Sequence, residues 1–218
     1  MTTTIKIDIT SDVVCPWCFV GQRRLETAIT TFKAQSHDNV IFDIKYLPFE
    51  LGGKNGLTKQ GIPKVEYLAN KFGASAVASM NARMADLGKE ENIAFRFGGN
   101  RSNTLDAHRI LYLAAQRGIQ YKVSEGLFSA YHEHERNIGD DQVLADVYAA
   151  AGGDRNEAIA YLKTDQNADV VKGLQQKALQ KGVNGVPYFE IEEYKISGAE
   201  SSQTFVSIFE KILEARQV

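Results

Sequence analysis

The N-terminal part of the chain alternates between two patterns of apolar positions. Apolar residues occupy every second position over 5–9 and again over 40–46, which predicts two strands with one buried face each. Between them, from residue 18 to about residue 34, apolar residues recur at helical spacing. A strand, a helix and a strand in this order predict a right-handed βαβ unit.

The middle of the chain has helical spacing almost throughout, from about residue 62 to about residue 180. Pro63 suits the first turn of a helix, and Asp140 suits an N-cap. Residues 93–97 alternate instead, which is typical of a short extended segment. We therefore expect a largely helical insertion with one brief interruption.

Strand character returns near the C-terminus. Residues 188–191 and 194–197 flank an acidic pair, which predicts a tight hairpin. Ser201 or Ser202 then caps a last amphipathic helix. The chain therefore ends in a ββα unit.

These patterns predict an α/β fold, βαβ … ββα, with an inserted all-helical domain. The first part of the α/β domain covers residues 1–61, the helical insertion 62–180, and the second part 181–218. The chain has 218 residues, of which 44% are hydrophobic, and this is enough for a substantial core.

Composition excludes several classes of partner. Lys plus Arg number 25 and Asp plus Glu 27, with no basic run, so we expect no nucleic-acid partner. No stretch approaches the roughly 20 consecutive apolar residues of a membrane span, so we expect no membrane partner. The N-terminus has neither a basic nor an apolar stretch of the kind found in secretory signals, so we expect a cytoplasmic protein.

The only two cysteines, Cys15 and Cys18, carry the candidate chemistry. A bond between them would close too short a loop to stabilise the fold much, which leaves redox chemistry or metal binding. Cys15 is expected at a helix N-terminus, where free backbone N–H groups favour a thiolate. Pro16 suits the first helical turn. We therefore predict that Cys15 attacks a disulfide and that Cys18, one turn on, resolves the mixed disulfide.

The alternative for a CxxC pair is half of a zinc site. The other candidate ligands are His37, His108, His132 and His134, none of which has the spacing of a second ligand pair. The His-Glu-His-Glu run over 132–135 also invites a metal hypothesis, but such a run is more often a solvated loop. We predict no metal, and no cofactor beyond the redox-active disulfide.

A second signal precedes the terminal hairpin, at Val186 and Pro187. A proline that begins a strand beside the cysteines would place the Val186 backbone where a substrate chain can pair with it. A trans proline at a strand start is the alternative. Trp17, the only tryptophan, is expected to be partly exposed. The predicted substrate-binding residues are Pro16, Trp17, Val186, Pro187 and Asn103.

The CPWC motif at 15–18 after a short strand, with GVP at 185–187 before the hairpin, resembles the DsbA-like branch of the thioredoxin superfamily. Residues 12–18, 21–25 and 102–109 are similar, more particularly, to the FrnE-type cytosolic members. The resemblance implies a thioredoxin-like fold interrupted by a helical domain, with Pro187 in cis. It implies a protein disulfide oxidoreductase or isomerase acting on protein thiols and disulfides.

The same architecture also resembles kappa-class glutathione transferases and 2-hydroxychromene-2-carboxylate isomerases. Those enzymes typically carry serine at the position of Cys15, so the presence of both cysteines favours dithiol redox chemistry. Asn103 and Thr104 lie where that branch would hold a small thiol, although a helix cap explains them equally well. Glutathione therefore stays open as a reductant or substrate, as does a redox-silent binding or chaperone module.

Overall fold

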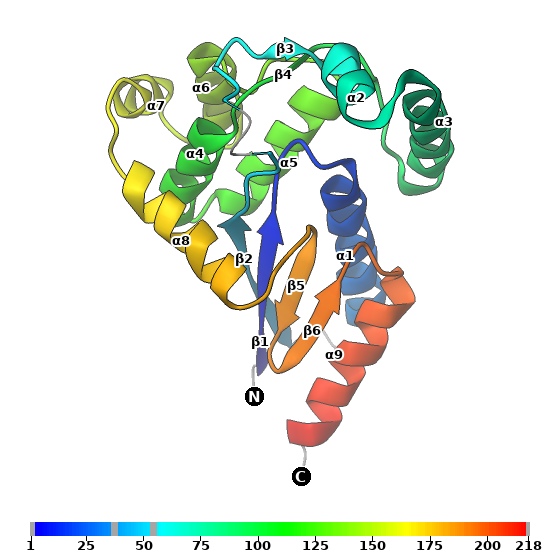
Figure 1. Cartoon of the computed structure of the whole chain (residues 1–218). Helices are drawn as coiled ribbons and strands as arrows, with labels where there is room; N and C mark the ends of the chain where they lie inside the picture. The colour runs from blue at the N-terminus through cyan, green and yellow to red at the C-terminus, as the bar shows by residue number, and fades with distance from the viewer. Residues whose placement is uncertain (1–2, 36–38, 53–55, 217–218) are drawn as a thin grey trace.

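The computed structural model describes residues 3–35, 39–52 and 56–216 (Figure 1). Within these residues a four-stranded sheet has the strand order β2-β1-β5-β6. β1 pairs in parallel with β2, and β5 pairs antiparallel with both β1 and β6. The predicted βαβ unit and C-terminal hairpin are thus confirmed. The strands are β1 (Thr3–Ser11), β2 (Val40–Pro48), β5 (Tyr188–Ile191) and β6 (Tyr194–Ser197).

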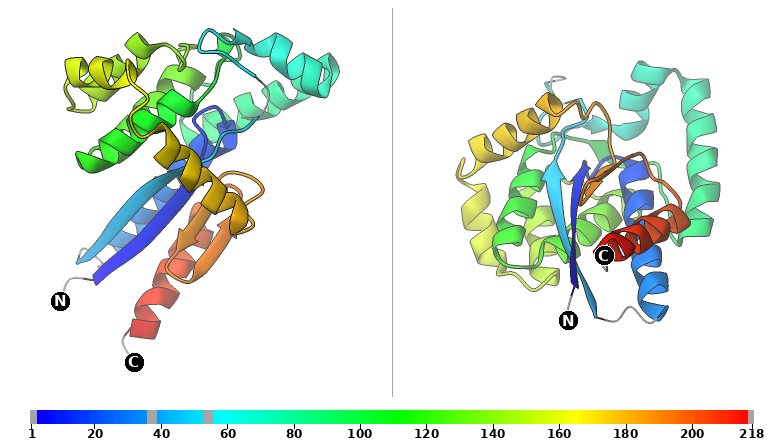
Figure 2. Two further views of the ribbon diagram at one scale, coloured as in Figure 1. Left: turned by 60° about the vertical axis from the view of Figure 1, so that its left-hand side comes forward. Right: turned by 90° about the horizontal axis from the view of Figure 1, so that it is seen from below.

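One face of the sheet is covered by α1 (Pro16–Ala34) and α9 (Ser202–Arg216), which lie side by side (Figure 2). The alternating isoleucines of β1 belong to the buried core on this face, as the period of two requires. Phe189 of β5 meets Phe205 of α9 edge-on, with 4.9 Å between the ring centroids. The sheet and these two helices therefore form one hydrophobic core.

The opposite face is covered near the top of the sheet by α8 (Ala168–Gln180). Ala178 of this helix packs in a small apolar cluster with Phe49 and Val183, and Tyr188 lies against the cluster. Tyr188 and its neighbour Phe189 point to opposite faces because successive strand residues alternate. Helices therefore cover both sides of the sheet where β1 ends.

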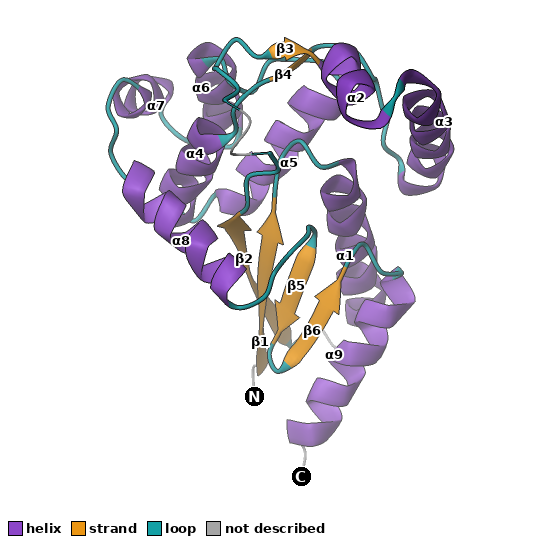
Figure 3. Cartoon of the chain, in the orientation of Figure 1, coloured by secondary structure: helices purple, strands orange, loops and turns teal. Residues whose placement is uncertain are grey.

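The chain between β2 and β5 is almost entirely helical, as Figure 3 shows by colour. A second core, around Leu127 and Tyr148, lies among these helices. None of the described helices has the length and apolar character needed to cross a membrane. Besides α8, the elements are β3 (Ile62–Pro63), α2 (Lys64–Phe72), α3 (Ala74–Glu91), β4 (Asn100–Arg101), α4 (Leu105–Gln116), α5 (Gln120–His132), α6 (Asp141–Ala150) and α7 (Arg155–Leu162).

Two of the predicted helix caps are confirmed. Asp140 caps α6 by accepting a hydrogen bond from the Gln142 N–H, and the Ser201 hydroxyl accepts one from the Thr204 N–H. The prediction that Pro63 lies in the first turn of a helix is wrong by one residue. Pro63 pairs with Asn100 in the short β3–β4 sheet, and α2 begins at the next residue.

The extended segment predicted over 93–97 has no strand partner among the described residues. Its apolar side chains turn inward instead. Ile93 is buried, and Phe95 meets Phe19 of α1 edge-on at 6.2 Å between centroids. The alternation therefore reflects packing over the start of α1 and not a sheet.

Gln22 of α1 joins the sheet to the helical segment. Its side-chain oxygen accepts hydrogen bonds from the hydroxyls of Tyr46 (2.6 Å) and Ser124 (3.2 Å). Its side-chain nitrogen donates to Glu125 at 2.6 Å. Because Tyr46 belongs to β2 and Ser124 and Glu125 to α5, the single amide connects three elements that meet below the active-site loop.

Candidate active site

The two cysteines lie where β1 ends and α1 begins. Cys15 is the N-cap residue, Pro16 occupies the first helical position, and the Cys15 N–H donates to the Asp12 carbonyl at 3.0 Å. Both cysteines are free thiols with little exposed surface, 6% for Cys15 and 3% for Cys18. The predicted placement of Cys15 at a helix N-terminus is confirmed. The Cys15 carbonyl accepts a hydrogen bond from the Cys18 N–H at 3.0 Å, which closes the first turn of α1.

The two thiols have different environments. Burial raises the pKa of Cys18 well above its usual value, and the neighbouring Cys15, through a hydrogen bond and its charge, raises it further. Ser11 and the Asp12 backbone oppose this shift with weaker hydrogen bonds. Cys18 is therefore a neutral thiol near pH 7 in the reduced protein.

Cys15 faces the segment that precedes the C-terminal hairpin. Its Sγ lies 3.6 Å from the carbonyl oxygen of Val186, in a geometry in which the thiol donates. The Val186–Pro187 peptide bond is cis, as the resemblance implies. The carbonyl of Pro187 in turn accepts a hydrogen bond from the Gly198 N–H at 2.8 Å, which ties this segment to the end of β6.

Gly21 allows this close approach of the hairpin to α1. A Cβ at this position would lie 3.2 Å from Pro187 Cγ and 3.1 Å from Phe189 Cζ. Contacts of a real Cβ are longer than this in nine cases out of ten. A side chain here would push Pro187 away from the helix that carries the cysteines.

A pocket of about 380 Å³ opens beside Cys15. Its walls come from the loop that carries Val14, Cys15, Pro16 and Trp17, from α2, α3 and α5, and from the segment between α3 and β4. Trp17 is half-buried and lines the pocket, in agreement with the expected partial exposure. The start of α1 and the loop before it thus form one wall of a cavity, and the other lining residues, apart from Leu51, belong to the helical segment.

His132 of α5 holds the loop before the cysteines. Its Nε2 lies 3.0 Å from the carbonyl oxygen of Val13, so this nitrogen is the donor. The ring is buried among Phe19, Phe95 and Phe128. Burial lowers the pKa of His132 to about 3, with a further contribution from nearby Lys64, so the ring is neutral at physiological pH.

Asp12 is a fully buried carboxylate three residues before Cys15. One oxygen accepts a hydrogen bond from the Leu51 N–H at 2.7 Å, and the other lies 3.4 Å from His108 Nε2. The same His108 nitrogen is 3.2 Å from the Phe49 carbonyl. The hydrogen bond from Leu51 therefore fastens Asp12 to the segment that follows β2, and His108 holds Phe49 of the same segment.

These contacts bear on the zinc alternative. Two of the candidate histidines, His108 and His132, are occupied with backbone carbonyls, and His37 lies outside the described residues. In the described part of the chain no three His, Cys, Asp or Glu side chains gather as a metal site.

Asn103 caps a helix in the structure. Its side-chain oxygen accepts a hydrogen bond from the Leu105 N–H at 2.8 Å, which is the contact of a helix cap. Thr104 occupies the N-cap position but makes no such side-chain bond. Asn103 is not among the residues that line the pocket, and its role toward a small thiol stays a prediction.

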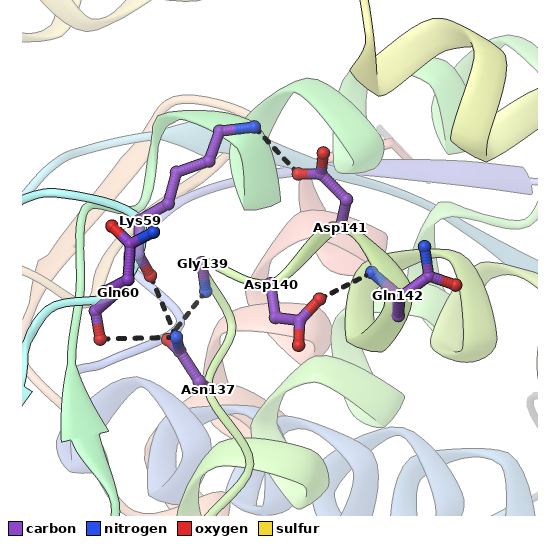
Figure 4. Close-up of a pocket in the computed structure, with 7 residues that line it drawn as sticks. All are labelled: Lys59, Gln60, Asn137, Gly139, Asp140, Asp141 and Gln142. Atoms are coloured by element: carbon purple, nitrogen blue, oxygen red, sulfur yellow. Dashed lines mark hydrogen bonds and ion pairs between the residues drawn. The ribbon is translucent and has the colours of Figure 1, made fainter.

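A second pocket, of about 370 Å³, lies where the loop before β3 meets α6 (Figure 4). Its polar groups bond with one another. Lys59 reaches Asp141 at 2.8 Å, and the Asn137 amide donates to the carbonyls of Lys59 and Gln60. These interactions fasten the loop that carries Lys59 and Gln60 to the segment around Asn137 and to the start of α6.

The sequence does not single out several residues of this site in the places that the structure gives them. Lys64 and Arg101 are buried basic residues in its wall, and no pattern in the sequence marks them. His132 is a candidate metal ligand in the sequence, but in the structure it holds the Val13 carbonyl. Asp12 belongs to the quoted motif at 12–18, but its hydrogen bond to Leu51 joins segments that are far apart in the sequence.

Comparison with known proteins agrees with this geometry. Uncharacterized protein YwbO of Bacillus subtilis (strain 168) is 26% identical over 217 residues, which cover 98% of each chain. The crystal structure of probable DsbA oxidoreductase SCO1869 from Streptomyces coelicolor matches with a TM-score of 0.82 and 29% identity, over 94% of this chain and 88% of that one. 2-Hydroxychromene-2-carboxylate isomerase shares the fold, with a TM-score of 0.74 at 13% identity over 97% and 98% of the two chains.

The family model of the DsbA-like thioredoxin domain matches residues 6–210. The predicted α/β, thioredoxin-like fold with a helical insertion is therefore confirmed, and the chain belongs to the DsbA-like thioredoxin domain family.

Proposed function

We propose that this protein is a thiol–disulfide oxidoreductase in which Cys15 is the nucleophile and Cys18 the resolving thiol. The observation that carries the proposal is the asymmetry of the pair. Cys15 caps α1 and borders the pocket, whereas Cys18 is buried behind it with a raised pKa. Only Cys15 is positioned to meet a substrate sulfur.

The exchange has two steps in the reducing direction. The Cys15 thiolate attacks one sulfur of the substrate disulfide, forming a mixed disulfide and releasing the other substrate sulfur as a thiolate. Cys18 then loses its proton and attacks Cys15 Sγ, which releases the second substrate thiolate and leaves a Cys15–Cys18 disulfide. The substrate gains two electrons and the protein loses two, and the reverse sequence oxidises a substrate dithiol.

The first step prepares the second. Two of the three influences that raise the pKa of Cys18 come from Cys15, namely its hydrogen bond and its charge. Both disappear when Cys15 enters a mixed disulfide, so the pKa of Cys18 falls and more of it becomes a nucleophile. Burial remains, so the pKa stays above its usual value.

The segment at Val186 and Pro187 supplies the substrate side of the site. Its backbone borders Cys15 and directly precedes a strand. A substrate chain in extended form would pair with the Val186 backbone, with Pro16 and Trp17 forming the facing surface.

The proposed partners are protein thiols and disulfides, or glutathione. The motifs at 12–18, 21–25 and 102–109 support placement in the FrnE-type subfamily. With only two cysteines, both in the redox pair, the chain uses no structural disulfides, which suits a reducing compartment such as the cytoplasm. We therefore propose a reductase or isomerase with a potential well below the value of about −120 mV found for strong oxidants.

Turnover tests the proposal. Reduced protein should reduce insulin disulfides and reactivate scrambled ribonuclease, and Cys15→Ser should abolish both activities. Unchanged activity in Cys15→Ser would refute the mechanism, and an inactive wild-type protein in both assays would favour a redox-silent binding module. A midpoint near −120 mV in glutathione buffers, followed by Trp17 fluorescence, would overturn the reductase assignment.

A further inference from the structure

The pocket beside Cys15 is lined by basic residues and by no acidic ones among the residues described. The cationic side chains belong to α2, to α3, to the segment that follows α3, and to β4. They are Lys64, Lys71, Arg83, Arg96 and Arg101.

None of these five side chains forms an ion pair with any residue that the structure describes. The contrast with Lys59 is direct, because that exposed lysine reaches Asp106 at 2.7 Å and Asp141 at 2.8 Å. Figure 4 shows the second of these contacts. Five cationic side chains that have no ion-pair partner among the described residues therefore line the pocket that borders the Cys15 sulfur.

Lys64 and Arg101 are built into the wall, with 7% and 5% of their surface exposed. The Arg101 guanidinium donates to the carbonyls of Ser102 and Leu51. The Lys64 ammonium donates to the Arg96 carbonyl at 3.3 Å and lies 4.5 Å from the ring centre of Tyr131. Neutral partners hold both side chains in place, and neither charge is neutralised.

Burial without a counter-charge is costly for an ammonium group. Accordingly, burial lowers the pKa of Lys64 to about 8, and Glu135 is the one carboxylate that opposes the shift. Glu135 accepts a hydrogen bond from the Gly98 N–H at 2.8 Å. A bound anion would offset the cost of burying Lys64.

The remaining surface of the pocket is apolar and largely aromatic. Arg83 lies 5.4 Å over the ring of Trp17, and Phe72 and Met80 are exposed at the pocket. The volume of about 380 Å³ suits a small molecule, and Cys15 is exposed over only 6% of its surface, which suits a narrow substrate.

We propose that this pocket binds the carboxylate-bearing, aromatic or otherwise apolar part of a small disulfide whose sulfur reacts with Cys15. The inference rests on the proposed function and names its substrate class. Lys64 and Arg96 face the carboxylate, while Trp17 and the exposed apolar residues cover the hydrocarbon part.

Single-turnover reduction tests the preference without an added reductant. Reduced protein converts one 5,5′-dithiobis(2-nitrobenzoate), an aromatic disulfide with two carboxylates, to two thiolates and becomes the Cys15–Cys18 disulfide. The comparison substrate is 4,4′-dithiodipyridine, which is also an aromatic disulfide but carries no carboxylate and is neutral. Lys64→Met and Arg96→Gln should each slow the dianion about tenfold, as expected for loss of a charge-assisted contact, and the neutral disulfide less than twofold. Lys59→Met is the control, because Lys59 forms ion pairs with Asp106 and Asp141 and does not line this pocket. It should slow neither substrate. Equal effects on both substrates, or none, would overturn the proposal.

A binding measurement separates this inference from the proposed function. In Cys15→Ser, Trp17 fluorescence should respond saturably to 4-nitrobenzoate and at least tenfold more weakly to 4-nitrobenzamide, and Lys64→Met should abolish the difference. Binding of 4-nitrobenzoate with no turnover of either disulfide would sink the oxidoreductase and leave the anion site standing. Turnover of the neutral disulfide, together with equal binding of 4-nitrobenzoate and 4-nitrobenzamide, would refute the anion site and support the oxidoreductase.

An acidic peptide is the other source of such an anion. To test this alternative, the single-turnover assay is repeated with a short peptide that has one internal disulfide and flanking glutamates. If its reduction depends on Lys64 and that of 5,5′-dithiobis(2-nitrobenzoate) does not, the small-molecule assignment is overturned. The opposite pattern supports it.

Discussion

The Sγ of Cys15 lies 3.6 Å from the carbonyl oxygen of Val186, although 171 residues separate the two along the chain. Strand pairing produces this contact, because β1 leads into Cys15 and β5 follows Val186, with Thr10 opposite Tyr188 in the antiparallel register. The helical insertion therefore lies in the sequence between Cys15 and Val186, and the pairing of β1 with β5 keeps these two residues in contact.

Replacement of Gly21 by alanine should damage the site. The new Cβ would lie 3.2 Å from Pro187 Cγ and 3.1 Å from Phe189 Cζ, so the hairpin must shift away from Cys15. We expect a several-fold loss of disulfide reduction and a loss of about 1–3 kcal/mol of stability, typical of overpacking. Gly173→Ala in α8 is the control, since nothing lies within 4 Å of its added Cβ, and it should gain about 0.5–1 kcal/mol. Equal stability changes in the two variants would contradict the close-packing argument.

Release of the second substrate thiolate should depend steeply on pH. Burial keeps the pKa of Cys18 raised even in the mixed disulfide, so its thiolate fraction increases about tenfold per pH unit below that pKa. Stopped-flow absorbance with a chromogenic disulfide resolves the two releases. A second phase with the same rate at pH 6 and pH 9 would show that deprotonation of Cys18 does not limit resolution.

His132 should make the fold sensitive to acid. Its pKa is about 3 in the folded protein and about 6.5 when unfolded, so between these values the unfolded state binds the extra proton. Stability is therefore lost as the pH falls from about 6.5 to about 3, at a slope approaching 1.4 kcal/mol per pH unit.

Denaturant unfolding of His132→Gln across this pH range checks the sign. The glutamine still offers a donor to the Val13 carbonyl but does not titrate, so the slope should become smaller. His134→Gln, two residues on and exposed, is the matched control for loss of an imidazole. An unchanged slope in His132→Gln would remove His132 as the cause.

Gln22 and Tyr46 should be energetically coupled. Gln22→Leu leaves the hydroxyls of Tyr46 and Ser124 without their acceptor and should cost about 2–4 kcal/mol. In a Tyr46→Phe background the same change should cost about 1 kcal/mol less, because one orphaned group is already gone. Urea denaturation of the four proteins gives the cycle, and additivity of the two changes would mean that the bond contributes nothing of its own.

The sequence predicts those parts of the fold that are specified locally. The alternation over 5–9, the caps at Asp140 and Ser201 and the helix-start position of Cys15 all depend on residues within a few positions of one another. The sequence singles out Val186 and Pro187 as a segment beside the cysteines, whereas the cis bond between them is implied only by the family resemblance. No local pattern specifies the close approach of Pro187 to Gly21 of α1.

The pocket illustrates what local patterns miss. Lys64 follows Pro63 as an ordinary first residue of a helix. It becomes a buried charge without an ion-pair partner in the described chain only through contacts with distant segments, namely the Tyr131 ring of α5 and the Arg96 carbonyl. The alternation at 93–97 misled for the same reason, since Ile93 and Phe95 pack inward over α1 without a strand partner in the described chain. Both outcomes depend on contacts between distant segments.

Mass mapping of a trapped mixed disulfide tests the division of roles between the two cysteines most directly. Cys18→Ser and Cys15→Ser each retain one thiol and are matched controls for one another. After exposure to a chromogenic disulfide at neutral pH, Cys18→Ser should rapidly carry one adduct on Cys15, stable to excess buffer, and Cys15→Ser should react far more slowly. Rapid modification of Cys18 in Cys15→Ser, with an unreactive Cys15 in Cys18→Ser, would contradict the mechanism.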